Sequence, residues 1–250
     1  MAGDLVRRRD PGLALSRVRA LRARRRSAPA RDPYDSFDFI MDQSERHGLR
    51  SAFYFIAGGS DARFDAAYSL EDPWIEALIA RIHARGHEIG LHPSYRTFRD
   101  AAAICRERDS LAQACERAGV EQAQWGGRQH FLRWENPTTW RAWEQAGLSY
   151  DSSLGFSAEP GFRCGVCTEY PVFDLLAKRE LTLRERPLLA MEMALFAGAA
   201  SSAAGLETLS TLRSCCERFG GNLTLLWHNS RLASPRERRL YLAAIERITG

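Results

Sequence analysis

The sequence lacks the features that mark membrane and nucleic-acid-binding proteins. Its 35 basic residues include a single lysine, Lys178, and the abundance of Arg and Ala is typical of a GC-rich bacterial genome, not of a nucleic-acid partner. No apolar run reaches the roughly 18 to 20 residues that span a bilayer as a helix, and Glu192 interrupts the longest candidate, residues 187–200. No secretory hydrophobic region follows the first residues. We therefore expect no membrane span, no nucleic-acid partner and a cytoplasmic location.

Two further signatures are missing. No Gly-rich phosphate loop follows any strand-like run, which argues against a dinucleotide-binding domain. The six cysteines include one C-x-x-C pair, Cys164 and Cys167, but no second pair or histidine pair completes a structural zinc site. The chain is also too long to need a disulfide scaffold. We interpret the pair as part of a surface loop with reduced thiols.

The charge is distributed unevenly along the chain. Residues 1–31 hold ten arginines against Asp4 and Asp10, a local charge of +8, so the rest is near −4 because the whole chain carries +4. The basic segment is compatible with a nucleic-acid arm, a targeting peptide or a solvated Arg-rich helix, and we favour the helix. The chain is 45% hydrophobic and 26% charged, which allows a substantial core. We expect an Arg-rich segment at residues 1–33 and one globular domain at residues 34–250.

Helical patterns alternate with short β-rich runs. Five times a helical pattern stops at a glycine and a strand-like run follows directly, at residues 51–57, 87–92, 120–125, 148–154 and 222–228. Such units form parallel sheets, and their number suits a barrel or an open doubly wound sheet. Residues 156–186 do not show this pattern, and we expect them to be an irregular insertion.

Polar residues gather where these strands end. His92 closes one run, Arg128 and His130 follow the next, Asp151 lies in the fourth, and His228 closes the last. In parallel βα folds the loops at the carboxyl ends of the strands carry the chemistry. We infer that these side chains meet in one functional site.

The stretch GHEIGLH contains two histidines, His87 and His92. Side chains alternate between the two faces of a strand, so residues five apart point to opposite faces and cannot share a metal without a bulge. We expect His92 to face the site and His87 to cap the preceding helix or pack beneath the sheet. His47 and His83 fall late in predicted helices and are expected to be bystanders.

The order of these segments resembles the polysaccharide deacetylase (NodB-homology) family. GHEIGLH is similar to that family's second motif, GHEIGNH, while GLRSAFYFIAGG resembles its first strand and loop. GGRQHF stands where its third motif supplies an arginine, and TLLWHN resembles its fifth motif. The likeness covers about residues 34–232.

The resemblance implies a distorted (β/α)7 barrel and a metal-dependent hydrolase. Such an enzyme removes acetyl groups from an N- or O-acetylated carbohydrate, acting on carbon–nitrogen bonds other than peptide bonds. A divalent metal, expected to be zinc, polarises the acetyl carbonyl and activates a water molecule. Carried over by motif, His92 is a metal ligand, His228 is the general acid and Arg128 orients the base. Asp151 is expected to orient His228 or to touch substrate.

Two departures from the family pattern matter. The family's Thr-Phe-Asp-Asp-Gly motif should precede the first helix, but residues 1–20 contain nothing similar. We therefore expect a barrel that is incomplete at its N-terminus. The family's second metal histidine should stand at position 96, which is Arg96, and a guanidinium is not an ordinary metal ligand. His130 is then the candidate for the second ligand.

Carbohydrate is the expected partner, and three further residues are candidates to bind it: Tyr95, Arg96 and Trp134. An alternative function stays open at this point. A relative that kept the barrel but not a complete metal site would bind carbohydrate without hydrolysing it. The oligomeric state has no signature in the sequence.

Overall fold

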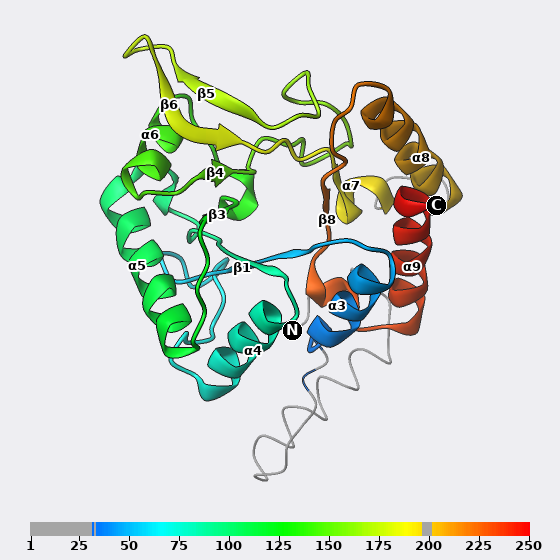
Figure 1. The fold of residues 1–250 in the computed structure, drawn as a ribbon, viewed down its shortest axis with the longest axis horizontal. Helices are drawn as coiled ribbons and strands as arrows, with labels where there is room; N and C mark the ends of the chain where they lie inside the picture. Colours follow the sequence, from blue (N-terminus) through cyan, green and yellow to red (C-terminus); the bar gives the residue numbers. More distant parts are fainter. Residues whose placement is uncertain (1–31, 33, 197–201) are drawn as a thin grey trace.

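The computed structural model describes residue 32, residues 34–196 and residues 202–250 (Figure 1). The Arg-rich segment at residues 1–33 lies almost wholly outside the described residues. The elements, in chain order, are α3 (Phe37–Arg46), β1 (Ala52–Phe55), α4 (Pro73–Ala84), β2 (Glu88–Leu91), η1 (Thr97–Arg99), α5 (Ala101–Arg117), β3 (Gly126–Gly127), η2 (His130–Leu132), α6 (Thr138–Gln145), β4 (Tyr150–Asp151), β5 (Tyr170–Asp174), β6 (Arg179–Glu185), β7 (Ala190–Met191), α7 (Glu192–Phe196), α8 (Ser202–Arg218), β8 (Leu225–Leu226), η3 (Asn229–Arg231) and α9 (Pro235–Thr249).

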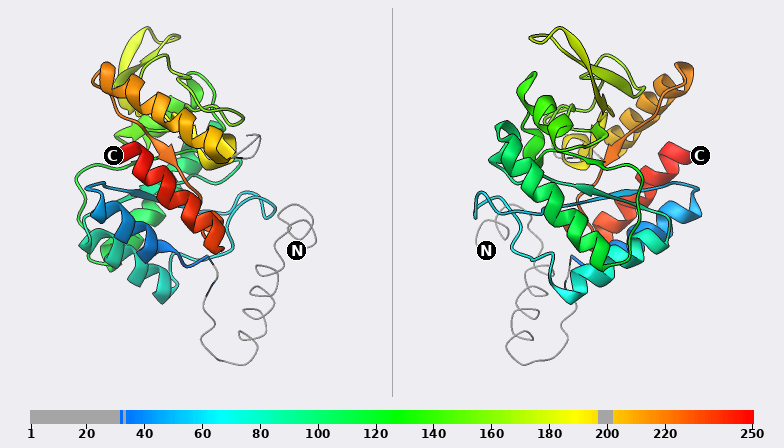
Figure 2. Two further views of the ribbon diagram at one scale, coloured as in Figure 1. Left: turned by 90° about the vertical axis from the view of Figure 1, so that its right-hand side faces the viewer. Right: turned by 60° about the vertical axis from the view of Figure 1, so that its left-hand side comes forward.

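The strands form two sheets. The larger has the order β1-β2-β3-β4-β6-β5, in which every neighbouring pair is parallel except β5 with β6. The smaller pairs β7 with β8 in parallel. Helices α4, α5 and α6 pack in succession along the larger sheet, whereas α8 and α9 pack on each other beside the smaller one (Figures 1 and 2). The predicted α/β class with a mostly parallel sheet is confirmed, and no ladder between described residues joins the two sheets.

Helix α4 shows how the sequence sets these elements. Its N-cap Asp72 accepts a hydrogen bond from the backbone N–H of Trp74, and Pro73 occupies the first turn, where its missing N–H costs nothing. Ile79 and Ile82 are fully buried on its inner face. The helix ends before Gly86, which has the left-handed φ of 78° that a glycine adopts without a steric penalty. The chain then turns directly into β2.

Strand β2 lies between β1 and β3 and places His92 just beyond its last residue. Its Ile89 and Leu91 are fully buried. The contact with β3 is close, because a Cβ atom on Gly127 would collide with the carbonyl oxygen of Leu91. A glycine at this position lets the ends of β2 and β3 come together, so that the backbone of Arg128 lies beside the His92 ring.

The third strand differs from expectation. Residues 120–125 do not form it, and β3 is the short stretch Gly126–Gly127. The Gln122 side chain accepts from the backbone N–H of Ile89 at 3.0 Å and donates to its C=O at 2.8 Å. One side chain therefore replaces the backbone pairing that an extended strand would make at this edge of β2.

Residues 156–186, which were expected to be irregular, contain the hairpin of β5 and β6. Strand β6 pairs in parallel with β4, so it continues the main sheet. Its residues alternate between exposed and buried, with Leu181 and Leu183 inward. This two-residue period was visible in RELTLRE and was the signal that the sequence interpretation missed. The hairpin projects beyond the body of the molecule (Figure 1).

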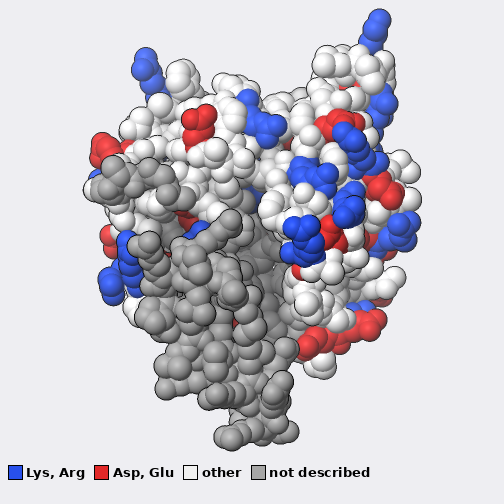
Figure 3. Space-filling view, turned by 180° about the vertical axis from the view of Figure 1, so that it is seen from behind, with Lys and Arg blue, Asp and Glu red and all other residues white. Residues whose placement is uncertain are grey.

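The surface charges are mixed. Over the visible described residues of the face in Figure 3, basic and acidic side chains lie interspersed. Arg85 illustrates the pattern, because its guanidinium contacts the carboxylates of Asp38, Asp42 and Glu45. In the portion of the chain that the structure describes, no helix has both the length and the apolar character to cross a membrane.

Candidate functional site

Three imidazoles form the centre of the candidate site: His92, His130 and His228. The ring centroids of His92 and His130 are 4.8 Å apart. The charge of His228 contributes to lowering the pKa of both. His87, by contrast, is buried at the other end of β2, where its Nδ1 accepts a hydrogen bond from the backbone N–H of Ser51. The separation of His87 from His92, expected from strand periodicity, is confirmed.

His92 is held as a neutral ring. Its Nδ1 lies 2.5 Å from the backbone oxygen of Arg128. A carbonyl oxygen only accepts, so Nδ1 carries the proton and Nε2 presents its lone pair. Burial, with a smaller contribution from the neighbouring His130, lowers the pKa of His92 to about 3. At neutral pH the ring is therefore available as a ligand.

His130 is oriented by a carboxylate that the sequence interpretation missed. Its Nδ1 lies 3.1 Å from Oδ1 of Asp65. Burial lowers the pKa of His130, and Asp65 opposes that effect. Asp65 in turn accepts backbone N–H bonds of 2.7 Å from Ser60, Asp61 and Tyr95. Burial raises the pKa of Asp65, but these hydrogen bonds outweigh burial and the net pKa is lowered. Asp65 lies in a loop between β1 and α4, with no strand-end signal.

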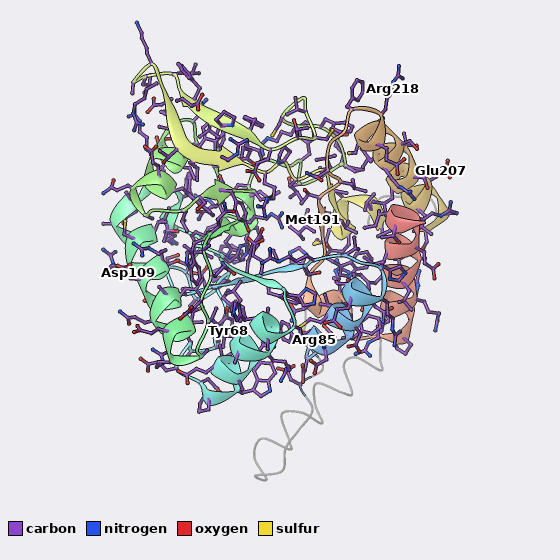
Figure 4. The ribbon with its side chains drawn as sticks, viewed as in Figure 1. Tyr68, Arg85, Asp109, Met191, Glu207 and Arg218 are labelled. Carbon is purple, nitrogen blue, oxygen red and sulfur yellow. The ribbon has the colours of Figure 1, made fainter. Side chains whose placement is uncertain are left out.

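His228 has a second carboxylate partner, Glu192, with Nδ1 at 2.7 Å from Oε1. The His228 side chain is 47% exposed and that of Glu192 only 4%. Strands β7 and β8 pair in parallel, Met191 with Leu226, so the residues that follow them emerge side by side. In the view of Figure 4, Met191 lies between the larger sheet and helices α8 and α9. Glu192 had a signal in the sequence, since it ends a short apolar strand as His92 and His228 do.

Arg128 and Asp151 lie deeper than these imidazoles. Arg128 donates from Nε to the backbone oxygen of Ser152 and from Nη2 to its Oγ, both at 2.8 Å. Asp151 is fully buried and accepts from the Oγ of Ser153 at 2.5 Å and from its backbone N–H at 3.0 Å. Burial raises the pKa of Asp151 to about 7, and the negative charge of Asp151 adds to the effect of burial on the pKa of Glu185. The carboxylate that contacts His228 is thus Glu192, while Asp151 has other partners.

The three predicted carbohydrate-binding residues fall in different places. Tyr95 lies near His130, with ring centroids 6.3 Å apart. The Arg96 guanidinium is exposed and pairs with Asp61, Nη2 to Oδ2 at 2.7 Å. Trp134 packs edge-on against Trp140 of α6, with centroids 4.7 Å apart, at the margin of the main core. Only Tyr95 among the three has a ring contact with a candidate site histidine.

A divalent metal fits the site by donor type but not by number. Both His92 and His130 keep Nε2 open while Nδ1 is held by an oxygen, which is how metal-binding histidines are usually oriented. Protein zinc sites use at least three protein ligands. Within residues 34–196 and 202–250, no group of three His, Cys, Asp or Glu side chains is arranged to hold a metal.

Comparison with known proteins bears on the fold. No protein-family model matches the chain, and no curated protein gives a significant match. A solved structure of a candidate polysaccharide deacetylase from Mycobacterium smegmatis is 18% identical, with a TM-score of 0.58, over 87% of this chain and 72% of that one. The Xyl-CE4 domain of a multidomain xylanase from the hindgut metagenome of Trinervitermes trinervoides is 12% identical, with a TM-score of 0.43, over 86% of this chain and 75% of that one. The chain therefore shares the mostly parallel α/β fold of a polysaccharide-deacetylase-like structure.

Proposed function

We propose that this chain is a hydrolase that removes acetyl groups from an N- or O-acetylated carbohydrate. The observation that carries the proposal is the close approach of His92 and His130, with the His228–Glu192 pair near enough for His228 to lower the pKa of both rings. The shared fold supports it, and so do the motif positions of these residues. His92 and His130 then serve as ligands, while His228 with Glu192 serves proton transfer.

His228 is the proposed general acid. Glu192 accepts the Nδ1–H of His228, which fixes the ring and leaves Nε2 directed away from the carboxylate. When Nε2 is protonated it donates that proton to the leaving nitrogen or oxygen of the sugar. Glu192 stabilises the imidazolium that exists before the transfer. The half-exposed position of His228 lets a substrate reach it, while the buried Glu192 stays out of contact.

His92 and His130 would supply two ligands, each through Nε2, to a metal expected to be zinc, which is one fewer than protein zinc sites use. When bound, such a metal polarises the acetyl carbonyl and lowers the pKa of a water molecule. Burial keeps both rings neutral, as ligand binding requires. Asp65 and the Arg128 carbonyl set the ring orientations, so these two groups govern how well the pair can bind.

An aromatic wall next to His130 is the proposed binding surface for a sugar ring. Phe131 is 59% exposed and its ring centroid lies 4.8 Å from that of His130. Tyr95 and Phe64 support it from behind, at 5.3 and 5.2 Å. Phe131 and Leu132 have φ values of 58° and 53°, a left-handed backbone that is unfavourable for residues other than glycine. The surrounding contacts therefore hold an apolar ring at the surface, where it can cover the C–H face of a pyranose.

Acetate release tests the proposal directly. The full chain is incubated with N-acetylglucosamine oligomers and with acetylated xylan, each with and without added zinc. We expect release that needs the metal, and a loss of about 10² to 10⁴-fold in His228→Ala. A control variant, Asp109→Asn, changes an exposed carboxylate on α5 (Figure 4) and should retain full activity. Failure to release acetate from any acetylated glycan in the presence of metal contradicts the proposal.

A non-catalytic carbohydrate-binding protein is the second candidate. It is favoured by one observation, that the described residues contain no arrangement of three metal ligands. Such a protein would bind the same oligosaccharides without releasing acetate, and His92→Ala would leave its affinity unchanged. Calorimetry with glycan and with zinc, performed separately, distinguishes the two functions.

A further inference from the structure

Two cysteines that the proposed reaction does not use lie together in a small core of their own. Cys167 is 6% exposed and Cys216 is 2% exposed, and both pack with Leu189. Cys167 belongs to the C-x-x-C pair that was expected in a surface loop. Cys167 does lie in a loop, but its thiol is buried because this loop packs against the end of α8.

Both cysteines hydrogen-bond to the same turn, which follows α8 at Gly221 and Asn222. The backbone carbonyl oxygen of Cys216 accepts from the backbone N–H of Gly221 at 2.8 Å, and that of Cys167 accepts from the N–H of Asn222 at 2.9 Å. The Cys216 thiol also donates to the carbonyl oxygen of Asn222 at 3.6 Å. A Cβ atom on Gly221 would collide with Sγ of Cys167, so a glycine is needed for this approach. Cys167 and Cys216 pack in the same small core, and their side chains are close enough to hydrogen-bond to each other.

The neighbouring thiol also acts on Cys216. Burial, with a contribution from the adjacent Cys167, raises the pKa of Cys216 to about 12. The other half of the C-x-x-C is directed elsewhere, because the Cys164 thiol donates to the carbonyl oxygen of Leu154 at 3.7 Å. The natural partner of Cys167 is therefore Cys216, 49 positions away, and not its neighbour in the motif.

We propose that Cys167 and Cys216 form a disulfide when the protein meets a disulfide oxidant such as oxidised glutathione. One protein thiolate attacks the oxidant's S–S bond, which gives a mixed disulfide and releases one glutathione thiol. The second protein thiol, losing its proton, then attacks the protein sulfur of the mixed disulfide and releases the other glutathione. The net change is one new Sγ–Sγ bond, two protein thiols oxidised and one glutathione disulfide reduced to two thiols.

The crosslink would act next to the site. It would join the loop that precedes β5 to the end of α8, and the chain between the two cysteines includes β7 and Glu192. Thr224 lies two residues after Asn222. Its backbone carbonyl oxygen accepts from the N–H groups of Leu189 and Ala190, both at 3.2 Å. The crosslinked turn therefore leads directly into the strands that carry Glu192 and His228. This inference does not depend on the proposed deacetylase function.

Thiol counting and mapping test the proposal. The full chain is held in oxidised glutathione, and a second sample is refolded from denaturant in a glutathione redox buffer, where burial does not limit access. We expect free thiols to fall from six to four and a peptide that joins Cys167 to Cys216 to appear on mass mapping. The melting temperature should rise by about 10 °C, because a loop of this length loses much conformational entropy in the unfolded chain, and a reductant should reverse the rise.

Matched variants decide the assignment. Cys167→Ser and Cys216→Ser should each abolish both the crosslink and the thermal shift. Cys164→Ser and Cys105→Ser should retain both. A crosslink from Cys164 to Cys167, glutathione adducts without an internal disulfide, or six free thiols after refolding would each overturn the proposal.

Discussion

The two sheets present their histidines in different ways. The larger sheet places His92 and His130 in a half-buried setting, where burial lowers the pKa of both and oxygen acceptors hold Nδ1. The smaller sheet places His228 nearly half in solvent, with the buried carboxylate of Glu192 behind it. The first environment favours a neutral ring that offers a lone pair. The second keeps a ring reachable from solvent, with its Nδ1 held by a carboxylate. The same side chain is thus prepared for two tasks by what surrounds it.

The largest effect on activity is expected from the histidine of the smaller sheet. His228→Ala should reduce kcat for acetate release by about 10² to 10⁴-fold while zinc affinity changes little, since only the proton donor is removed. Kinetics at saturating metal, together with zinc calorimetry, measure the two quantities. Equal losses in zinc affinity and kcat would erase the distinction between the sheets. Circular dichroism of the variant confirms that it is folded.

The two carboxylates sharpen the same comparison. Asp65→Asn should weaken zinc binding by about 10 to 100-fold, because it alters the group that orients His130. Glu192→Gln should lower kcat and leave zinc affinity near that of the parent. Asp65 also accepts several backbone N–H groups, so Asp65→Asn should be assayed well below its melting temperature. The opposite pattern, with metal affinity lost in Glu192→Gln, would show that the roles are reversed.

The sequence predicted which histidines lie near one another better than it predicted the strands. His92 and His228 followed from the rule that parallel strands end in functional loops, and the structure brings their imidazoles within electrostatic reach. Glu192 obeys the same rule but was read only as an interruption of an apolar run. Asp65 could not be found in this way, because its position depends on backbone N–H groups of a loop that only the folded chain assembles.

The strand errors have a different cause. The Gln122 side chain makes the hydrogen bonds that a paired strand would make, and no local sequence pattern predicts this. Strand β6 is the opposite case, since its alternation was visible, but the turn-rich surroundings hid it. Burial of Cys167 depended on a contact with distant residues of α8, which a single sequence does not reveal.

The aromatic wall gives a smaller, selective effect. Phe131→Ala should raise KM for an acetylated oligosaccharide about tenfold, the equivalent of about 1.4 kcal/mol, with little change in kcat. A small acetyl ester without a sugar ring should be hydrolysed as before, because it does not reach the wall. Phe131→Tyr keeps the ring and is the matched control. If Phe131→Ala affects both substrates equally, the residue supports the site in a general way and does not bind the sugar.

A buried carboxyl on the larger sheet should give an effect of a different kind, a change in stability with pH. The pKa of Asp151 is raised to about 7 by burial, against about 3.9 in an unfolded chain. Between these values the folded state binds more protons than the unfolded state, so the free energy of unfolding falls as pH rises, by up to about 1.4 kcal/mol per pH unit. Asp151→Asn should reduce this slope without removing it, because burial also raises the pKa of Glu185. Urea unfolding from pH 4 to 7 measures the slope, and an unchanged slope would show that Asp151 keeps its charge when buried, as a group paired with Arg128 would.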